Sequence, residues 1–123
     1  MKPRIFKADS LKECLTSEGC FIAENWGLST GDKAVSVARA RVEPGVTTKA
    51  HHLKGPEEIY IIVKGKGQVY IGDLKPTEVV DGDVVAIPAG TSQRIRNTGE
   101  SDLVFYCVCT PSFQESVYVN EEP

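Results

Sequence analysis

The sequence has little of what marks a membrane, secreted or nucleic-acid-binding protein. No stretch of about 18 apolar residues, the length of a membrane-spanning helix, occurs in the chain. The N-terminal stretch MKPRIFKADSLKEC is rich in charge and lacks the apolar core of a signal peptide. The formal net charge is −3, so no basic surface favours nucleic acid as a partner. We therefore expect a cytoplasmic protein that binds neither membrane nor nucleic acid.

Cysteine is also sparse, with only four residues, at positions 14, 20, 107 and 109. Without a secretion signal, four cysteines do not indicate a disulfide framework. Cys107 and Cys109 lie two apart in the apolar run LVFYCVC, so they share one face of a strand. Their spacing is not that of a structural zinc pair. We expect buried free thiols.

Turn-forming residues, in contrast, are frequent and evenly spread along the chain. Glycine and proline punctuate stretches such as VEPGV, KGKG and NTGESD, and between them lie short runs such as AVSVARARV and EEIYIIV. Regularly spaced short strands of this kind are typical of an all-β sandwich or barrel. The sequence therefore predicts one all-β domain over residues 1–123. The exception is residues 9–18, where Leu11 and Leu15 lie four apart and indicate a short helical segment.

Two strand-like runs show which side chains face inward. In the run QRIRN, residues 93–97, the arginines alternate with Gln93, which places Gln93 on the inner face. In EEIYIIV, Glu58 and Tyr60 share one face, but the opposite face, beginning with Ile59, is apolar as well. An apolar outer face needs a cover, and we expect a second copy of the chain to provide it in a homodimer.

Both histidines of the chain lie in the segment HHLKGPEEIY, residues 51–60. This segment reads as a strand, a tight turn at 54–57 and a second strand, and a hairpin of this kind would set His51 opposite Glu58. An imidazole and a carboxylate together suit a divalent metal ion such as zinc, iron, manganese or nickel. A metal site takes three or four protein ligands, so a further donor must come from elsewhere in the chain.

Two stretches resemble the paired motifs of the cupin family. The first, at 45–65, matches the family spacing at Gly45, His51, Glu58 and Gly65. The second, at 82–97, matches it at Gly82, Pro88, Gly90 and Asn97. The resemblance implies a double-stranded β-helix, or jelly-roll barrel, with a divalent metal ion and a small-molecule substrate inside.

The chain departs from the family pattern at two expected metal ligands. Leu53 stands where the family has its second histidine, and Gln93 where it has its third. The ligands that carry over are His51 and Glu58, and Gln93 is a candidate replacement because an amide oxygen can ligate a cation. His52 remains an alternative to His51. Strand alternation points it away from the shared face, whereas a β-bulge would turn it inward.

Two functions fit these residues. In the first, the protein is a metal-dependent enzyme of isomerase, lyase, cyclase or dioxygenase type, as the resemblance implies. Glu58 then ligates the metal or acts as a base, and Tyr60 orients the substrate through its hydroxyl. In the second, the protein is a non-catalytic small-molecule-binding cupin with a degenerate metal site. His51, Glu58 and Gln93 then satisfy one another by hydrogen bonding, and Tyr60 belongs to the core.

Overall fold

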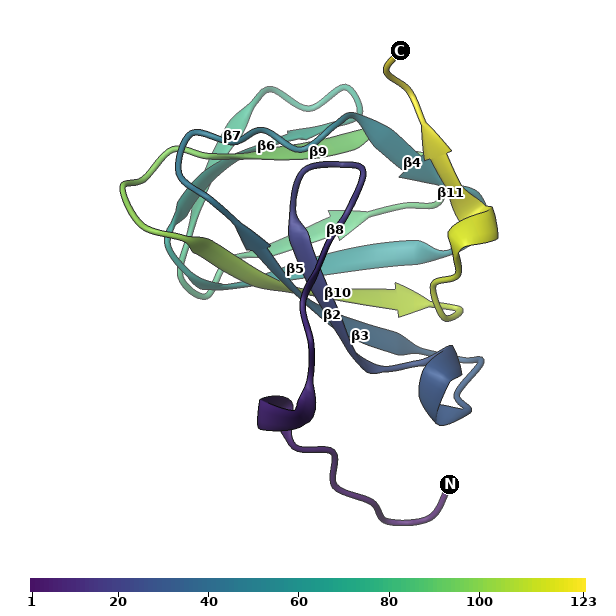
Figure 1. Cartoon of the computed structure of the whole chain (residues 1–123). Helices are drawn as coiled ribbons and strands as arrows, with labels where there is room; N and C mark the ends of the chain where they lie inside the picture. The colour runs from purple at the N-terminus through teal and green to yellow at the C-terminus, as the bar shows by residue number, and fades with distance from the viewer.

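The computed structural model describes all of residues 1–123 and folds into two facing β-sheets (Figure 1). The first sheet has six strands in the order β1 (Cys14–Leu15), β2 (Phe21–Trp26), β3 (Ser36–Val42), β10 (Leu103–Thr110), β5 (Glu57–Lys64) and β8 (Val84–Ile87). The second has five strands in the order β11 (Tyr118–Asn120), β4 (His51–Leu53), β9 (Gln93–Asn97), β6 (Lys66–Ile71) and β7 (Thr77–Val80). This arrangement confirms the predicted all-β jelly roll.

Helical structure is limited to single 3-10 turns. They are η1 (Ala8–Ser10), η2 (Leu28–Thr30) and η3 (Glu115–Val117). The short helical segment expected at residues 9–18 is present only as η1, and the helix predicted for the remainder is wrong. Cys14 and Leu15 instead pair with β2, and the Thr16 amide donates to the Cys20 carbonyl at 2.9 Å. Strand pairing satisfies these backbone groups, whereas one leucine pair is too little apolar surface to hold a helix. No helix is long and apolar enough to cross a membrane.

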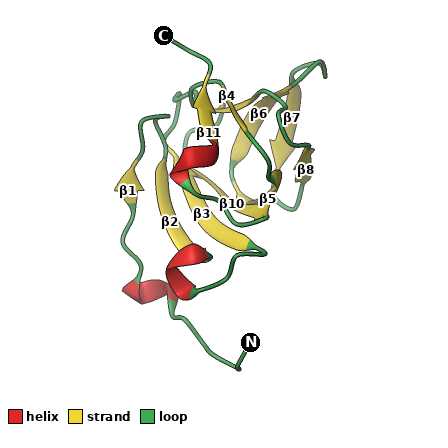
Figure 2. Ribbon diagram, turned by 90° about the vertical axis from the view of Figure 1, so that its right-hand side faces the viewer, coloured by secondary structure: helices red, strands yellow, loops and turns green.

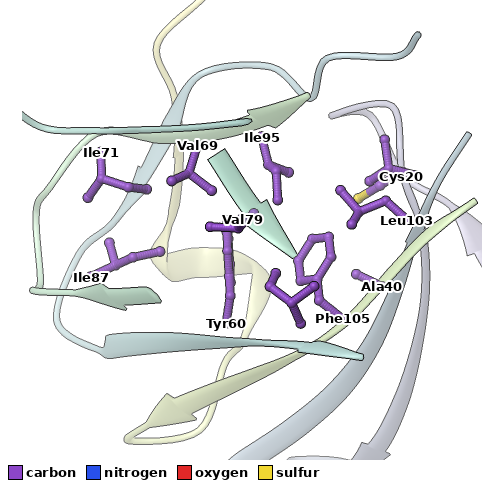
Figure 3. Packing of buried hydrophobic residues seen from close by; sticks show 12 residues of the cluster. Cys20, Ala40, Tyr60, Val69, Ile71, Val79, Ile87, Ile95, Leu103 and Phe105 are labelled. Atoms are coloured by element: carbon purple, nitrogen blue, oxygen red, sulfur yellow. The ribbon is translucent and has the colours of Figure 1, made fainter. Parts of the chain in front are cut away.

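The core lies between the two sheets. Figure 3 shows Val69, Ile71 and Ile95 of the second sheet pointing toward Ile87, Tyr60 and Phe105 of the first, and all are buried. The rings of Tyr60 and Phe105 tilt against each other with centroids 4.7 Å apart. Inward positions recur at every second residue, as the alternation in 93–97 predicts.

The two strands that carry the histidines and Glu58 do not form the expected hairpin. β4 pairs with β9 and β11 in the second sheet, whereas β5 pairs with β10 and β8 in the first. His51 therefore lies opposite Gln93 as its cross-strand neighbour, and Glu58 lies beside Cys109 and Ile87. The turn between β4 and β5 carries the chain from one sheet to the other, so His51 and Glu58 belong to facing walls of the barrel.

Two terminal segments flank one end of the barrel. β11 runs antiparallel beside β4, and Figure 2 shows it with its preceding 3-10 turn at the edge of the second sheet. At the edge of the first sheet, the turn between β1 and β2 is tied to the barrel by the Lys49 amide, which donates to the Glu18 carbonyl at 2.9 Å. Both segments bring side chains to the cavity described below.

The outer face of β5 is apolar and exposed in the single chain. Ile59, Ile61 and Val63 are 40%, 39% and 45% exposed, and Val84 on neighbouring β8 is 61% exposed. This is the face for which a homodimer is expected. The dimer itself remains a prediction.

Candidate functional site

A cavity of about 720 Å³ lies inside the barrel. Its walls are mostly apolar, from Ile22, Ala38, Ala40, Leu53, Ile95 and Phe105. The exposed residues Leu15 and Glu115 also line it and mark its mouth. This volume lies within the range of about 300–1,000 Å³ that small-molecule sites occupy.

His51 lines the cavity from β4, and its Nδ1 contacts oxygens of two neighbouring residues. Its Nδ1 lies 3.0 Å from the Lys49 carbonyl oxygen and 3.3 Å from Oε2 of Glu18. The ring stacks on Tyr118 of β11, with centroids 4.8 Å apart and planes 25° apart. Because Nδ1 is taken up by these oxygens, Nε2 is the nitrogen left for chemistry in the cavity.

His52 occupies the opposite face of the same strand. Its Nδ1 lies 2.7 Å from a carboxylate oxygen of Glu121, and its side chain is 29% exposed. It does not line the cavity. Regular strand alternation, with no bulge in β4, separates the two rings.

Glu58 is buried in the cavity wall, with its Oε1 lacking any hydrogen-bond partner. Burial raises the pKa of its carboxyl group, and the Gln93 amide and the His51 ring partly oppose this shift. A buried polar atom without a partner is uncommon in folded proteins. The cavity wall therefore contains a buried acceptor that the protein itself leaves unpaired.

Gln93 lies behind the cavity rather than in its lining. It is 1% exposed, and its Oε1 accepts the hydroxyl hydrogen of Tyr60. Burial raises the pKa of that tyrosine well above its ordinary value, so the hydroxyl stays protonated and able to donate. The amide oxygen proposed as a metal ligand is therefore already engaged, and the Tyr60 hydroxyl is directed at Gln93.

The sequence offered no signal for two further residues that complete the site. Glu18 lies in the turn between β1 and β2, and its Oε1 accepts the Cys20 thiol hydrogen at 3.0 Å while its Oε2 faces His51. Tyr118 comes from the other end of the chain, and burial raises its pKa to about 12. A glutamate beside a turn glycine and a tyrosine in a short strand are ordinary features, so only the fold reveals their role.

All four cysteines line the same cavity as free thiols. Cys20, Cys107 and Cys109 lie in its inner part, whereas Cys14 is exposed. Cys107 and Cys109 share the inner face of β10, as their spacing predicts. Burial is the largest cause that raises the pKa of each of the three inner thiols. They are therefore poor nucleophiles in the folded protein.

Comparison with known proteins agrees with this architecture. Residues 38–109 match the model of the cupin domain family. An uncharacterised protein of Methanocaldococcus jannaschii is 34% identical over 107 residues, which are 85% of this chain and 84% of that protein. The chain belongs to the cupin family.

Two other similar proteins have names that refer to oxalate. An oxalate-binding protein of Thermotoga maritima is 38% identical to this cupin over 77 residues, or 63% of each chain. The crystal structure of a predicted oxalate decarboxylase from Thermotoga maritima superposes with a TM-score of 0.78 at 26% identity. That superposition covers 88% of this chain and 99% of the other.

Cupins commonly hold a divalent metal ion, and the side chains present here supply part of a ligand set. His51 Nε2 and Glu58 Oε1 are two suitable donors on facing walls. The third predicted ligand, Gln93, has its oxygen engaged by Tyr60, and Leu53 supplies no donor. No three side chains of the histidine, cysteine, aspartate and glutamate types gather as a metal site. Two donors are fewer than a protein metal site uses, so this set does not fit a resident metal as it stands.

Proposed function

We propose that this cupin binds a small organic molecule in its barrel, with Glu58 and His51 in direct contact with the ligand. The observation that carries the proposal is the unpartnered Oε1 of Glu58 in the wall of a cavity of about 720 Å³. Leaving a buried acceptor unsatisfied costs about 1–3 kcal/mol. A donor group on a ligand would recover that free energy while its apolar body packs against the walls.

The same two residues are suited to moving a proton on the bound molecule. Glu18 and the Lys49 carbonyl fix one side of the His51 ring, which leaves Nε2 to accept or donate a proton. Glu58, with its pKa raised by burial, exchanges a proton more readily near neutral pH than an exposed glutamate does. If the protein is an enzyme, we infer a proton-transfer reaction of lyase or isomerase type.

A metal-dependent function is the second candidate, and one observation favours it. A carboxylate beside the far nitrogen of a histidine, as Glu18 is beside His51, is the arrangement that orients metal-binding histidines in many proteins. Zinc, iron, manganese or nickel would then bind to His51 and Glu58 and need a third donor. Metal analysis of protein purified without an affinity tag separates the two candidates. Near-stoichiometric metal that is lost in His51→Ala would favour the metal-dependent function.

Titration with benzyl alcohol, followed by amide NMR shifts, tests the proposed binding. We expect saturable shifts at residues that line the cavity, because the hydroxyl can donate to Glu58 while the ring contacts apolar walls. Ala38→Phe places a ring inside the cavity and should abolish these shifts. Ala34→Phe, the same change at an exposed position, is the matched control and should preserve them. Shifts that do not saturate, or that persist in folded Ala38→Phe, would contradict the proposal.

A further inference from the structure

The charged side chains around the cavity are almost all of one sign. Four glutamates line it, namely Glu18, Glu24, Glu58 and Glu115. No lysine or arginine does, and His51 is the only basic side chain in the lining. An organic anion that entered this cavity would therefore meet carboxylates and no fixed cation.

Two of these glutamates are enclosed and share that single histidine. Glu58 is 7% exposed, and the side chain of Glu18 is 14% exposed. Glu18 already has partners in His51 and the Cys20 thiol. Glu58 lines the cavity, and its Oε1, buried in the wall, has no partner. The unmet need at this site is for a hydrogen-bond donor, and a positively charged donor fits it best.

The two arginines of β3 pair with carboxylates outside the barrel. Arg41 pairs with Glu13 and Asp102 at 3.0 and 3.3 Å on the outer side of β3. Arg39 also pairs with Glu13, at 3.4 Å. Because these side chains are engaged outside and no lysine or arginine lines the cavity, the protein supplies no fixed positive charge there, and a ligand could bring one.

We propose that the ligand of this cavity carries a protonated amine that donates to Glu58, with an apolar body packed against Ile95 and Phe105. An ammonium group has three N–H donors and no acceptor, so it can satisfy Glu58 Oε1 and neutralise the excess of carboxylate charge. A cation beside Glu58 also favours the ionised form of that carboxyl group. The proposal rests on the proposed function, because it names the chemical class of the molecule that the cavity binds.

This class differs in charge from the ligand named for one relative. The Thermotoga maritima protein that is 38% identical over 77 residues is called an oxalate-binding protein. Oxalate is a dianion without hydrogen-bond donors at neutral pH. It offers no donor to an ionised Glu58, and no lysine or arginine lines this cavity to balance its charge.

Three probes of one shape test the proposal, namely benzylammonium, benzyl alcohol and benzoate at neutral pH. Chelator-treated protein is used, so that no metal bridges an anion to the wall. We expect benzylammonium to bind at least ten times more tightly than benzoate in NMR or calorimetric titrations. Glu58→Gln should remove most of this preference, because the amide keeps the shape and loses the charge. Glu57→Gln, an exposed neighbour on the same strand, should leave it unchanged.

The remaining outcomes of these titrations distinguish failure of the amine preference from failure of ligand binding itself. If Glu58→Gln fails to fold, Glu18→Gln should still reduce the preference, since it removes the second enclosed carboxylate. Benzoate or oxalate binding as tightly as benzylammonium would overturn the inference while leaving the proposed binding function intact. A preference that survives in both folded variants would also overturn it. Failure of all three probes would instead remove the proposed function, and this inference with it.

Discussion

The hydroxyl of Tyr60, which lines the cavity, donates to the amide oxygen of Gln93, which lies behind the cavity wall. This bond engages the amide oxygen that made Gln93 a candidate metal ligand. It also orients the amide so that its NH₂ group is directed away from Tyr60. Hydrogen bonding by this amide opposes the upward shift that burial causes in the pKa of Glu58. The hydrogen bond between Tyr60 and Gln93 therefore stabilises the wall of the cavity and does not contact a bound ligand.

Tyr60→Phe should therefore destabilise the fold. The substitution leaves the buried Gln93 oxygen without a donor, which should lower the free energy of unfolding by about 1–3 kcal/mol. Tyr70→Phe is the matched control, since the Tyr70 hydroxyl donates to Gln68 in a half-buried contact. Urea denaturation of both variants measures the difference. Equal losses in the free energy of unfolding would show that the buried Tyr60 hydrogen bond stabilises the fold no more than the half-buried Tyr70 hydrogen bond.

Restoring the family histidines should create a metal site. In Leu53→His/Gln93→His, two imidazoles join His51 and Glu58, and the Tyr60 hydroxyl no longer meets a glutamine oxygen. We expect about one zinc ion per chain after dialysis, because four ligands suffice for a tetrahedral site. The natural chain, treated identically, should retain only traces. Equal zinc in both proteins, measured by elemental analysis, would contradict the reading of the natural donor set as incomplete.

Thiol labelling should distinguish Cys14 from the other cysteines. Cys14 is exposed, whereas burial raises the pKa of Cys20, Cys107 and Cys109 and keeps these thiols protonated. Iodoacetamide at neutral pH should therefore modify one thiol quickly in the folded protein and all of them after unfolding. Cys14→Ser should abolish the fast phase. Rapid labelling of the folded Cys14→Ser variant would show that the cavity thiols are reactive.

The oligomeric state tests the exposed face of β5. We propose a homodimer, so light scattering should report twice the chain mass of 13.4 kDa. Ile61→Lys places a charge at the centre of the apolar face and should shift the protein to the monomer mass. Leu74→Lys changes a leucine that is 70% exposed in the turn before β7, and should have no effect. A monomer mass for the natural chain would disprove the dimer.

The sequence alone determined the features that depend on local order. Period-two alternation placed Gln93 inside β9 and put Cys107 and Cys109 on one face of β10, because successive side chains on a strand point to opposite sides. The spacing of two motifs indicated the cupin barrel, and the regular turns indicated its all-β class. Each of these patterns involves only a few neighbouring residues, so it can be recognised without knowledge of the fold.

Tertiary structure alone decided which side chains meet. His51 and Glu58 converge from facing sheets rather than from one hairpin, and Glu18 reaches His51 from a turn more than thirty residues earlier. Tyr118 stacks on the same ring from the far end of the chain. The partner of the Gln93 amide was equally hidden, because a hydrogen bond between strands depends on packing across the barrel. Such long-range contacts leave no local pattern in the sequence. Here they bring several glutamates around one cavity and leave Glu58 Oε1 without a partner.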